Sequence, residues 1–260
     1  MIRNADSRGV GLARALSKLG YCSRSRAVVL IRAGHVRLNG ATQRDPERAV
    51  RPERDRIEVD GVAVERQKHV WLMLNKPRGM VTTASDEKGR STIYDCLKLG
   101  LPWLAPVGRL DKASEGLLLL TNDSEWGAKI TAPETHLEKK YHVQVAALAD
   151  DALIGNLTRG VRTDGNEVFR VKSVQILRLG ERNSWLEVVL DEGKNRQIRR
   201  MLETLGIEVL RLVRVAIGPL ALGDLAKGAY RPLTTEEKQL LDEAMRLRSR
   251  VKALYSAEPA

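Results

Sequence analysis

This chain has few cysteines. It also lacks histidines at metal-ligand spacing and the glycine motifs that bind nucleotides. Its 260 residues include only Cys22 and Cys96, which lie far apart and outside any CxxC or Cys/His cluster. We therefore expect two buried thiols, and neither a disulfide framework nor a zinc site. The four histidines show no ligand spacing, and no GxGxxG in a βαβ setting or GxxxxGK[ST] loop is present. The sequence predicts no metal, redox group or nucleotide cofactor.

Long apolar stretches are missing too. No stretch approaches the ~18 residues of a membrane span, and residues 1–9 lack the apolar core of a signal peptide. We expect a cytoplasmic protein that does not associate with membranes. Positive charge, by contrast, is in excess, because 44 Lys and Arg face 33 Asp and Glu, for a net charge of +11. This balance favours a polyanionic partner, and nucleic acid before an anionic surface.

Residues 10–66 predict a compact basic module of two helices and short strands. The leucines from position 12 to 19 recur at helical spacing, and a glycine directly after them supplies a stop. Ser23 or Ser25 can cap a second helix that ends at Gly34. Short strands with turns are expected at 36–40 and 56–61.

This order of two short helices followed by GHVRLNG resembles the alpha-L RNA-binding module found in a small-subunit ribosomal protein and in tyrosyl-tRNA synthetase. Residues 1–66 hold 14 Lys and Arg against 8 Asp and Glu, and phosphate contacts from such cations position RNA without reading its sequence. The alternative is that these arginines only solubilise two amphipathic helices. The phosphate contacts that the resemblance implies are Arg24, Arg26, Arg32 and Arg37.

A linker is expected at residues 61–69, which mix small and charged residues without a strong period. The apolar segment 70–75 then predicts a buried strand, and the KPRG sequence after it predicts a turn. Lys76 and Arg78 of this turn can contact phosphate, although a plain strand-ending turn explains them equally well. The predicted domains are residues 10–66 and 67–250.

The stretch PVGRLDKASEGLLLLTND, residues 106–123, places one carboxylate, Asp111, between a turn and a buried run. Gly108 permits backbone geometry that other residues resist, and the leucines at 117–120 form a run typical of a strand buried on both faces. Burial of Asp111 against this run would disfavour its charged form, so an opposite charge is expected nearby. A bare RLD tripeptide is also explained by a solvated turn.

Beyond residue 138, period-two alternation predicts antiparallel strands as far as about residue 190, with Asp164-Gly165 as a hairpin signal. The other elements expected are a short helix at 92–99, an amphipathic helix at 195–205, a strand at 209–218, and a final helix that begins near a capping box of Thr234 and Glu237. The fold class expected is therefore α+β, a small N-terminal module followed by a mixed, largely antiparallel sheet with helices.

Two further groups of residues have competing interpretations. Tyr141 begins an alternating strand, where an aromatic residue usually belongs to the core. Four cations within seven residues form either a basic RNA-facing patch or ordinary surface charge. They are Lys194, Arg196, Arg199 and Arg200.

Four blocks, in this order, resemble the RsuA-type pseudouridine synthases, the ribosomal RNA branch of that superfamily. The blocks are LNKPRGMVTT (74–83), VGRLDKASEGLLLLTND (107–123), EKKYHVQV (138–145) and EGKNRQIRRMLETLG (192–206). The resemblance runs from about residue 10 to about residue 233. Two positions depart from the family: Ser114, where Thr is more common and the hydroxyl is kept, and Ser124, where Gly is common. The resemblance implies a synthase domain with a central cleft after the RNA-binding module.

The resemblance also implies roles for the site residues. Asp111 would break the C–N glycosidic bond of a uridine, by attack at C1′ or through a glycal intermediate, before the base rejoins through carbon without a cofactor. Lys194 is implied as the cation beside Asp111, whereas the three neighbouring arginines suit phosphate or structural roles. Tyr141 would stack on the uracil, and its hydroxyl can assist proton removal from C5.

The target uridine must be turned out of folded RNA, which costs a few kcal/mol. The guanidinium of Arg109, two residues before the carboxylate, can stack or hold phosphate where the base has left. Its alternative role is a local ion pair.

The expected function is isomerisation of a uridine in ribosomal RNA or pre-ribosomal particles by a monomeric enzyme. The segments ERNSWLEVVLDEGKNRQIRRM and LTRGVRTDG favour the large-subunit branch, with small-subunit RNA as the alternative. A noncatalytic ribosome assembly factor would use the same basic surfaces only to bind RNA. An RNA glycosidase would cleave the same bond and release free uracil.

Overall fold

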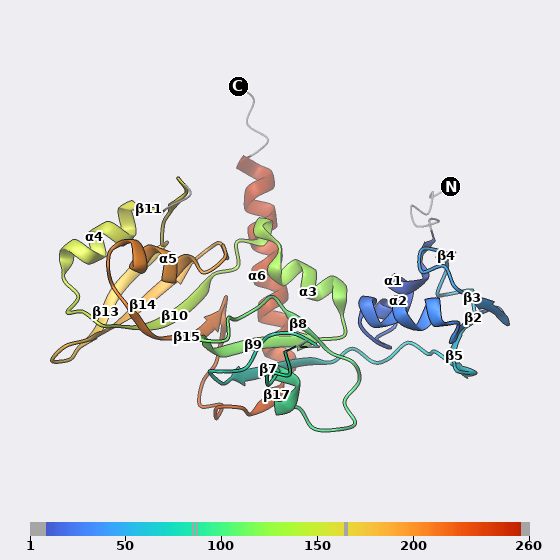
Figure 1. Cartoon of the computed structure of the whole chain (residues 1–260). Helices are drawn as coiled ribbons and strands as arrows, with labels where there is room; N and C mark the ends of the chain where they lie inside the picture. Colours follow the sequence, from blue (N-terminus) through green and yellow to red (C-terminus); the bar gives the residue numbers. More distant parts are fainter. Residues whose placement is uncertain (1–8, 85, 87, 164–165, 256–260) are drawn as a thin grey trace. The chain divides into compact units, whose positions relative to one another are not determined.

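The computed structural model describes residues 9–84, 86, 88–163 and 166–255, with side chains as far as residue 246 (Figure 1). The chain divides into two compact units. Unit 1 consists of the described residues up to Trp71 with Lys98–Ala105 and Leu120–Trp126, and unit 2 consists of Leu72–Leu97, Pro106–Leu119 and the described residues from Gly127 onward. Within the described part of the chain, no helix combines the length and the apolar character needed to cross a membrane.

Unit 1 contains two short helices and an antiparallel sheet in the order β3-β2-β5-β6, while β1 pairs with β4. Ser23 caps α2, because its side chain accepts a 3.1 Å hydrogen bond from the amide of Arg26, and Gly34 ends the helix at φ +86°. The predicted order of two helices and short strands is confirmed, with Ser23 as the cap. The elements are β1 (Val10–Gly11), α1 (Leu12–Lys18), α2 (Arg24–Ala33), β2 (Val36–Leu38), β3 (Ala41–Gln43), β4 (Ala49–Val50), β5 (Ile57–Val59) and β6 (Val62–Ala63).

The second sheet has the strand order β13-β14-β10-β15-β9-β7-β17, with β16 beside β15 and β8 beside β9. Its strands are β7 (Trp71–Lys76), β8 (Ala105–Val107), β9 (Glu115–Thr121), β10 (Lys139–Val145), β13 (Ser173–Leu179), β14 (Ser184–Leu190), β15 (Val209–Ile217), β16 (Leu220–Ala221) and β17 (Tyr230–Pro232). The accompanying elements are η1 (Ile93–Cys96), α3 (Ser124–Thr131), η2 (Pro133–Thr135), α4 (Asp151–Arg159), the paired strands β11 (Val161–Arg162) and β12 (Val168–Phe169), α5 (Gln197–Thr204) and α6 (Thr235–Tyr255).

An apolar cluster holds α4 and α5 against one half of this sheet. Leu157 of α4 and Met201 of α5 pack with Val143 and Leu186, and all four are at most 2% exposed. In this half β10 pairs antiparallel with both β14 and β15. β15 then joins β9 in a parallel pair, in which Val213 lies opposite Glu115 and Arg214 opposite Gly116.

Gly116 permits the close approach of β9 and β15. Its φ is +100°, and a Cβ atom at this position would lie 2.3 Å from the carbonyl oxygen of Arg214. A side chain therefore meets both backbone strain and a backbone clash. Gly79 has a similar φ of +95°, but a Cβ there would meet nothing within 4 Å.

We expect Gly116→Ala to lower the melting temperature clearly more than Gly79→Ala. The Gly79 variant carries only the backbone strain, about 1–3 kcal/mol, whereas the Gly116 variant also pushes two strands apart. Thermal unfolding of both purified variants measures the difference. Equal losses would mean that the β9–β15 contact adjusts at no cost.

Most of the expected elements are confirmed, but the segment 139–190, expected to form strands, also contains the helix α4. The segment expected as a short helix at 92–99 is the 3-10 helix Ile93–Cys96, and the amphipathic helix begins at Gln197. Cys22 is buried as expected, but Cys96 is only half-buried, and both thiols are free. The hairpin signal at 164–165 lies outside the described residues. Glu237 and Thr234 form the predicted capping box, with hydrogen bonds of 2.9 and 3.2 Å.

Candidate active site

The turn that carries Asp111 connects β8 to β9. Leu110, 6% exposed, anchors the turn in the core, and the hydroxyl of Thr82 donates to its carbonyl oxygen at 2.7 Å and accepts from its amide at 3.3 Å. The amide of Ser114 donates to the Asp111 carbonyl at 2.9 Å and closes the turn. Asp111 itself is exposed. The turn thus lies at the rim of the core as predicted, but the predicted burial of the carboxylate is wrong.

Lys76 binds the backbone of this turn through its ammonium group. Its side chain is 0% exposed, and its Nζ donates to the carbonyl oxygens of Pro77 at 3.0 Å, Asp111 at 3.2 Å and Ser114 at 2.9 Å. An ammonium has three N–H donors, so all three are used. Desolvation lowers the pKa of Lys76 to about 8, although the charges of Asp111 and Glu115 oppose this shift. The predicted phosphate contact by Lys76 is wrong, because the side chain is enclosed.

Arg199 is the second cation coupled to Asp111. Its Nη2 donates to the carbonyl oxygen of Ala113 at 3.0 Å, within the turn. Burial lowers the pKa of Arg199, the Asp111 charge raises it, and Arg196 and Arg78 lower it further. Asp111 and the two other arginines thus all act on the charge of Arg199.

Lys194 has different neighbours. Its Nζ lies 3.7 Å from Glu192 Oε2, 4.0 Å from Glu167 Oε1 and 5.3 Å from the centre of the Phe169 ring. Arg200 lies 4.5 Å from the centre of the same ring and 3.2 Å from Glu167 Oε2. The sequence assigned the charge beside Asp111 to Lys194, whereas the electrostatic couplings of this structure favour Lys76 and Arg199.

A helical pattern distinguishes Arg199 from its neighbours. The buried face of α5 includes Ile198, Met201 and Leu202. At 3.6 residues per turn, Arg199 flanks that face while Arg200 lies opposite it. Arg199 was therefore the better candidate for a cation directed at the core rim.

Tyr141 lies in a row of residues that crosses three strands. In the register of β10 and β15 it faces Arg214, which in turn faces Gly116 of β9. Tyr141 is half-buried and packs against the apolar cluster under α5. The ring thus belongs in part to the core, and its role in the site stays a prediction.

Arg214 is a buried cation that the sequence interpretation missed. It is 6% exposed, and its Nε donates to the carbonyl oxygen of Leu117 at 2.7 Å. Its Nη2 has no hydrogen-bond partner among the described residues. The alternating pattern of β15 carried the signal, since the neighbour two positions earlier, Leu212, is buried on the same face.

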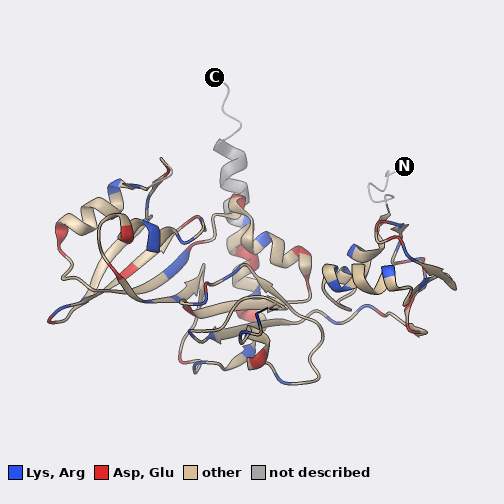
Figure 2. Cartoon of the chain, in the orientation of Figure 1, with Lys and Arg blue, Asp and Glu red and all other residues tan. Residues whose placement is uncertain are grey.

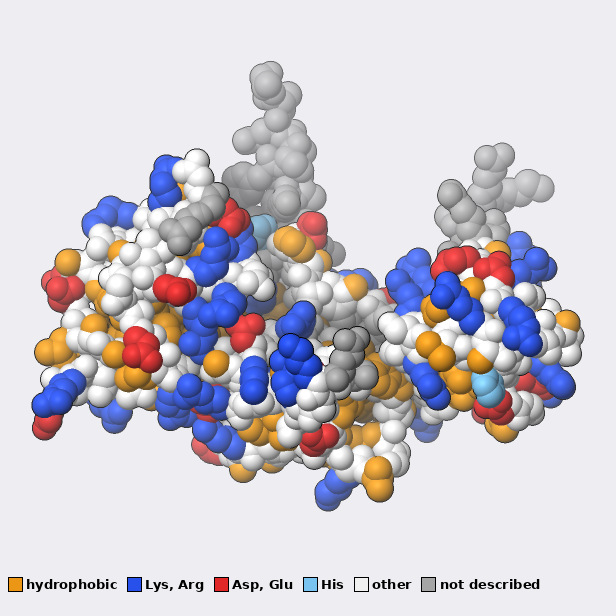
Figure 3. All heavy atoms as spheres, viewed as in Figure 1, with side chains coloured by type: hydrophobic (Ala, Val, Ile, Leu, Met, Phe, Trp, Pro, Cys, Tyr) orange, Lys and Arg blue, Asp and Glu red, His pale blue; other side chains and the backbone are white. Residues whose placement is uncertain are grey.

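Asp111 opens into a hollow of about 450 Å³ in unit 2. The hollow is lined by Val81, Thr82, Thr83, Asp86, Lys88, Arg90, Arg109, Leu110, Asp111 and Lys112. Arg90 is neutralised by Asp86 at 2.6 Å, while Arg109 and Lys112 are exposed. Lys and Arg side chains gather on the face of unit 2 shown in Figure 3. Arg78 and Arg196 are also exposed, and both act electrostatically on Arg199.

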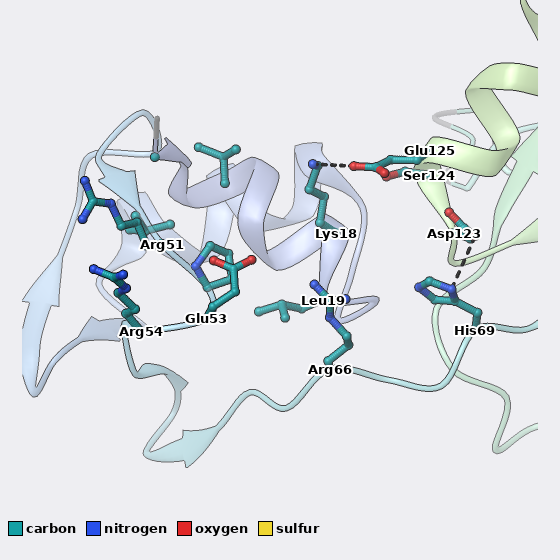
Figure 4. A pocket seen from close by; sticks show the side chains of 14 residues that line it. Lys18, Leu19, Arg51, Glu53, Arg54, Arg66, His69, Asp123, Ser124 and Glu125 are labelled. Carbon is teal, nitrogen blue, oxygen red and sulfur yellow. Dashed lines mark hydrogen bonds and ion pairs between the residues drawn. The ribbon is translucent and has the colours of Figure 1, made fainter. Parts of the chain in front are cut away.

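A larger hollow, of about 640 Å³, lies in unit 1 (Figure 4). It contains the ion pairs Lys18–Glu125 at 2.7 Å and His69–Asp123 at 3.4 Å. No residue of the Asp111 turn lines it. The smaller hollow is therefore the better candidate for chemistry.

The predicted phosphate contacts of unit 1 are all exposed. α2 carries three of them and β2 carries the fourth (Figure 2). No contact in the structure tests their role, which stays a prediction. These residues are Arg24, Arg26, Arg32 and Arg37.

Comparison with known proteins supports the resemblance. The model of the family "RNA pseudouridylate synthase" matches residues 70–204, and the S4 domain model matches residues 10–65. An uncharacterized RNA pseudouridine synthase of Rickettsia prowazekii (strain Madrid E) is 37% identical over 88% of this chain and 97% of its own length. The ribosomal large subunit pseudouridine synthase B of Bacillus subtilis (strain 168) is 36% identical over 88% of this chain and 94% of its own length.

A solved structure agrees with these relatives. The crystal structure of a pseudouridylate synthase superposes with a TM-score of 0.63 at 31% identity, over 89% of this chain and 99% of that one. The mixed α+β fold with a largely antiparallel sheet is thus that of a pseudouridine synthase behind an S4 RNA-binding domain. The chain belongs to the RNA pseudouridine synthase family.

Proposed function

We propose that this enzyme isomerises a uridine of large-subunit ribosomal RNA, with Asp111 as the catalytic carboxylate. The observation that carries the proposal is the exposed Asp111 on a turn held from beneath by Lys76 and flanked by Arg199. The Bacillus subtilis relative named for the large subunit supports the choice of RNA. The proposed domains are residues 10–66 and 67–250, in a cytoplasmic monomer that uses no cofactor.

The reaction begins when a uridine, turned out of the RNA, enters the hollow at Asp111. Arg109 occupies the place that the base has left or holds its phosphate, and Arg78, Arg196 and exposed Lys112 bind the flanking backbone. RNA covers Asp111 and removes water from it. The carboxylate then either bonds to C1′ or removes a sugar proton to give the glycal, and in both routes the C1′–N1 bond breaks and uracil leaves as its anion. The nearby cations keep the carboxylate charged in the drier site.

Tyr141 stacks on the free uracil while the base turns. Uracil C5 then bonds to C1′, and the sugar releases the carboxylate or takes back its proton. The Tyr141 hydroxyl assists removal of the C5 proton, and N1 of the product ends protonated. Arg199 replaces Lys194 as the proposed cation beside Asp111. Lys194 and Arg200, near the start of α5, form ion pairs with Glu167. Arg200 remains a candidate contact to RNA. These roles require no group other than the side chains of this chain.

We expect Tyr141→Phe to keep RNA affinity and to lose about 10²–10⁴-fold in the rate of conversion, the typical contribution of a side chain that assists proton transfer. Tyr141→Leu should lose more, since stacking is also removed. Single-turnover rates on a ribosomal RNA fragment measure both variants. Equal rates for Phe and Leu would remove stacking from the proposal.

Chemical mapping of pseudouridine in ribosomal RNA tests the choice of substrate. Cells that lack this chain should lose one or more large-subunit signals, which return when the gene is restored. Loss of a small-subunit signal would instead support the alternative branch, and an unchanged map would contradict the proposal. Free uracil released from RNA by the purified protein would indicate an RNA glycosidase.

A further inference from the structure

Glu115, four residues after Asp111, is a nearly enclosed carboxylate. It is 2% exposed and begins β9. Its Oε1 accepts from Arg211 Nε at 3.1 Å and its Oε2 from Arg211 Nη2 at 3.2 Å, while Lys227 forms an ion pair with Oε2. Two-point contact with a guanidinium fixes both the distance and the orientation of a carboxylate.

The two cations belong to different segments. Arg211 lies on β15, with its guanidinium 5.5 Å from the centre of the Trp185 ring of β14. Lys227 lies in the loop between β16 and β17. That loop is tied to Asn75, whose Nδ2 donates to the carbonyl oxygen of Leu225 at 2.7 Å.

Asn75 closes a circuit of contacts around the catalytic turn. Its carbonyl oxygen accepts from the amide of Gly228 at 2.8 Å, directly after Lys227. The next residue along β7 is Lys76, which holds the carbonyl oxygens of Asp111 and Ser114. Glu115 is therefore connected to both ends of the turn, through the chain and through Lys227, Asn75 and Lys76.

We infer that Glu115 is a positioning residue, which through Arg211, Lys227 and Lys76 fixes the turn that presents Asp111 to the substrate. The inference rests on the proposed function, because the turn matters only if Asp111 does the chemistry. Glu115 itself need not touch RNA.

The charge of Glu115 also affects the pKa of Lys76, which can be measured. The groups that act on the charge of Lys76 are Asp111, Glu115 and Cys96, all of which raise its pKa against the effect of burial. A neutral Lys76 has two N–H donors for three carbonyl oxygens. Loss of the Glu115 charge should therefore release one carbonyl at a lower pH than in the wild type.

We expect Glu115→Gln to lower kcat about tenfold with KM unchanged. In the wild type kcat should fall as Lys76 loses its proton near pH 8, and in Glu115→Gln this fall should occur at lower pH. The matched control is Glu187→Gln. Glu187 lies on β14 of the same sheet and contacts three side chains, Lys140 at 2.9 Å, Gln175 at 3.2 Å and His142 at 3.5 Å, none of which belongs to the Asp111 turn. The control should keep both kcat and its pH profile.

If the role of Glu115 is purely structural, Glu115→Gln will have a lower melting temperature but the same kcat, and the same fall of kcat at alkaline pH, as the wild type. This result would overturn the inference. If Glu115→Gln does not fold, Lys227→Met replaces it. This variant removes Lys227, the exposed partner of Glu115, and should also lower kcat. An unchanged kcat would again overturn the inference.

A readout independent of activity separates this inference from the proposed function. The amide of Ser114 donates to the Asp111 carbonyl, and its hydrogen exchange reports how firmly the turn is held. Glu115→Gln should exchange this amide faster than the wild type, and Glu187→Gln should not. Unchanged exchange would refute the positioning role, whereas a wild-type enzyme that forms no pseudouridine would refute the proposed function alone.

Discussion

Asp111→Asn should form no detectable pseudouridine while it still binds ribosomal RNA. The amide has the shape of the carboxylate but can neither attack C1′ nor accept the sugar proton on the glycal route, so the loss should be at least ~10³-fold. Lys76 holds the turn by the backbone carbonyl of residue 111, which the substitution leaves in place. The fold and the affinity for RNA should therefore persist.

The measurement is pseudouridine mapping on a ribosomal RNA fragment, with binding followed by fluorescence anisotropy. Asp151→Asn is a suitable control, since Asp151 is also an exposed aspartate of unit 2 and lies on α4. Equal conversion by wild type and Asp111→Asn would show that Asp111 is not the catalyst. If neither protein converts uridine although both bind RNA, the noncatalytic assembly factor becomes the better interpretation.

Lys76→Met should lose about 10²-fold in kcat and should also lower the free energy of unfolding. Methionine fills the space of the lysine stem but removes the ammonium donor from three carbonyl oxygens, of which only that of Asp111 keeps another donor described above, the Ser114 amide. A misplacement of ~1 Å at a reacting group can cost ~10²-fold. Unpaired carbonyls destabilise the folded state, at about 1–3 kcal/mol each. The removal of a buried charge offsets part of this loss. Comparison of kcat with the free energy of unfolding in urea separates the two effects.

The pH dependence of the wild type has opposite signs for activity and stability. The pKa of Lys76 is about 8 in the folded protein against 10.5 for a free lysine side chain, so kcat should fall above pH 8 as the third hydrogen bond is lost. Between these two values the unfolded chain binds more protons than the folded one. The contribution of Lys76 to the free energy of unfolding should therefore rise with pH over this range.

Lys76→Met provides the check, because it lacks the titrating group. Its residual activity should not fall near pH 8, unlike the activity expected of the wild type. Its free energy of unfolding should lack the rise with pH that is specific to Lys76. An identical alkaline limb in both proteins would assign the limb to another group.

The sequence predicted the elements whose signals are local. Ser23 and Gly34 act through atoms a few residues away, and so do Thr234 and Glu237 of the final capping box. The leucines at 117–120 are 0% exposed, as their continuous apolar pattern indicated. Such features can be recognised from sequence because the energy that favours them is set within one or two turns of chain.

The details of the site could not be predicted in the same way. Lys76 was interpreted as a surface cation, since a lysine in a turn is usually solvated, but carbonyl oxygens 35 and 38 positions later enclose it. The environment of Glu115 depends on Arg211, which is 96 positions away. Contacts of this kind follow from strand order and register, which local patterns do not specify.

The parallel pair between β9 and β15 has a consequence for the time at which the enzyme becomes competent. Its partners, Glu115 and Val213, are 98 positions apart, and pairings of such separation form late because a long loop must close first. A nascent chain still lacking β15 has no Arg211 to pair with Glu115, which follows the turn that carries Asp111. We therefore expect the growing polypeptide to become active only after β15 (Val209–Ile217) has been synthesised and has paired with β9.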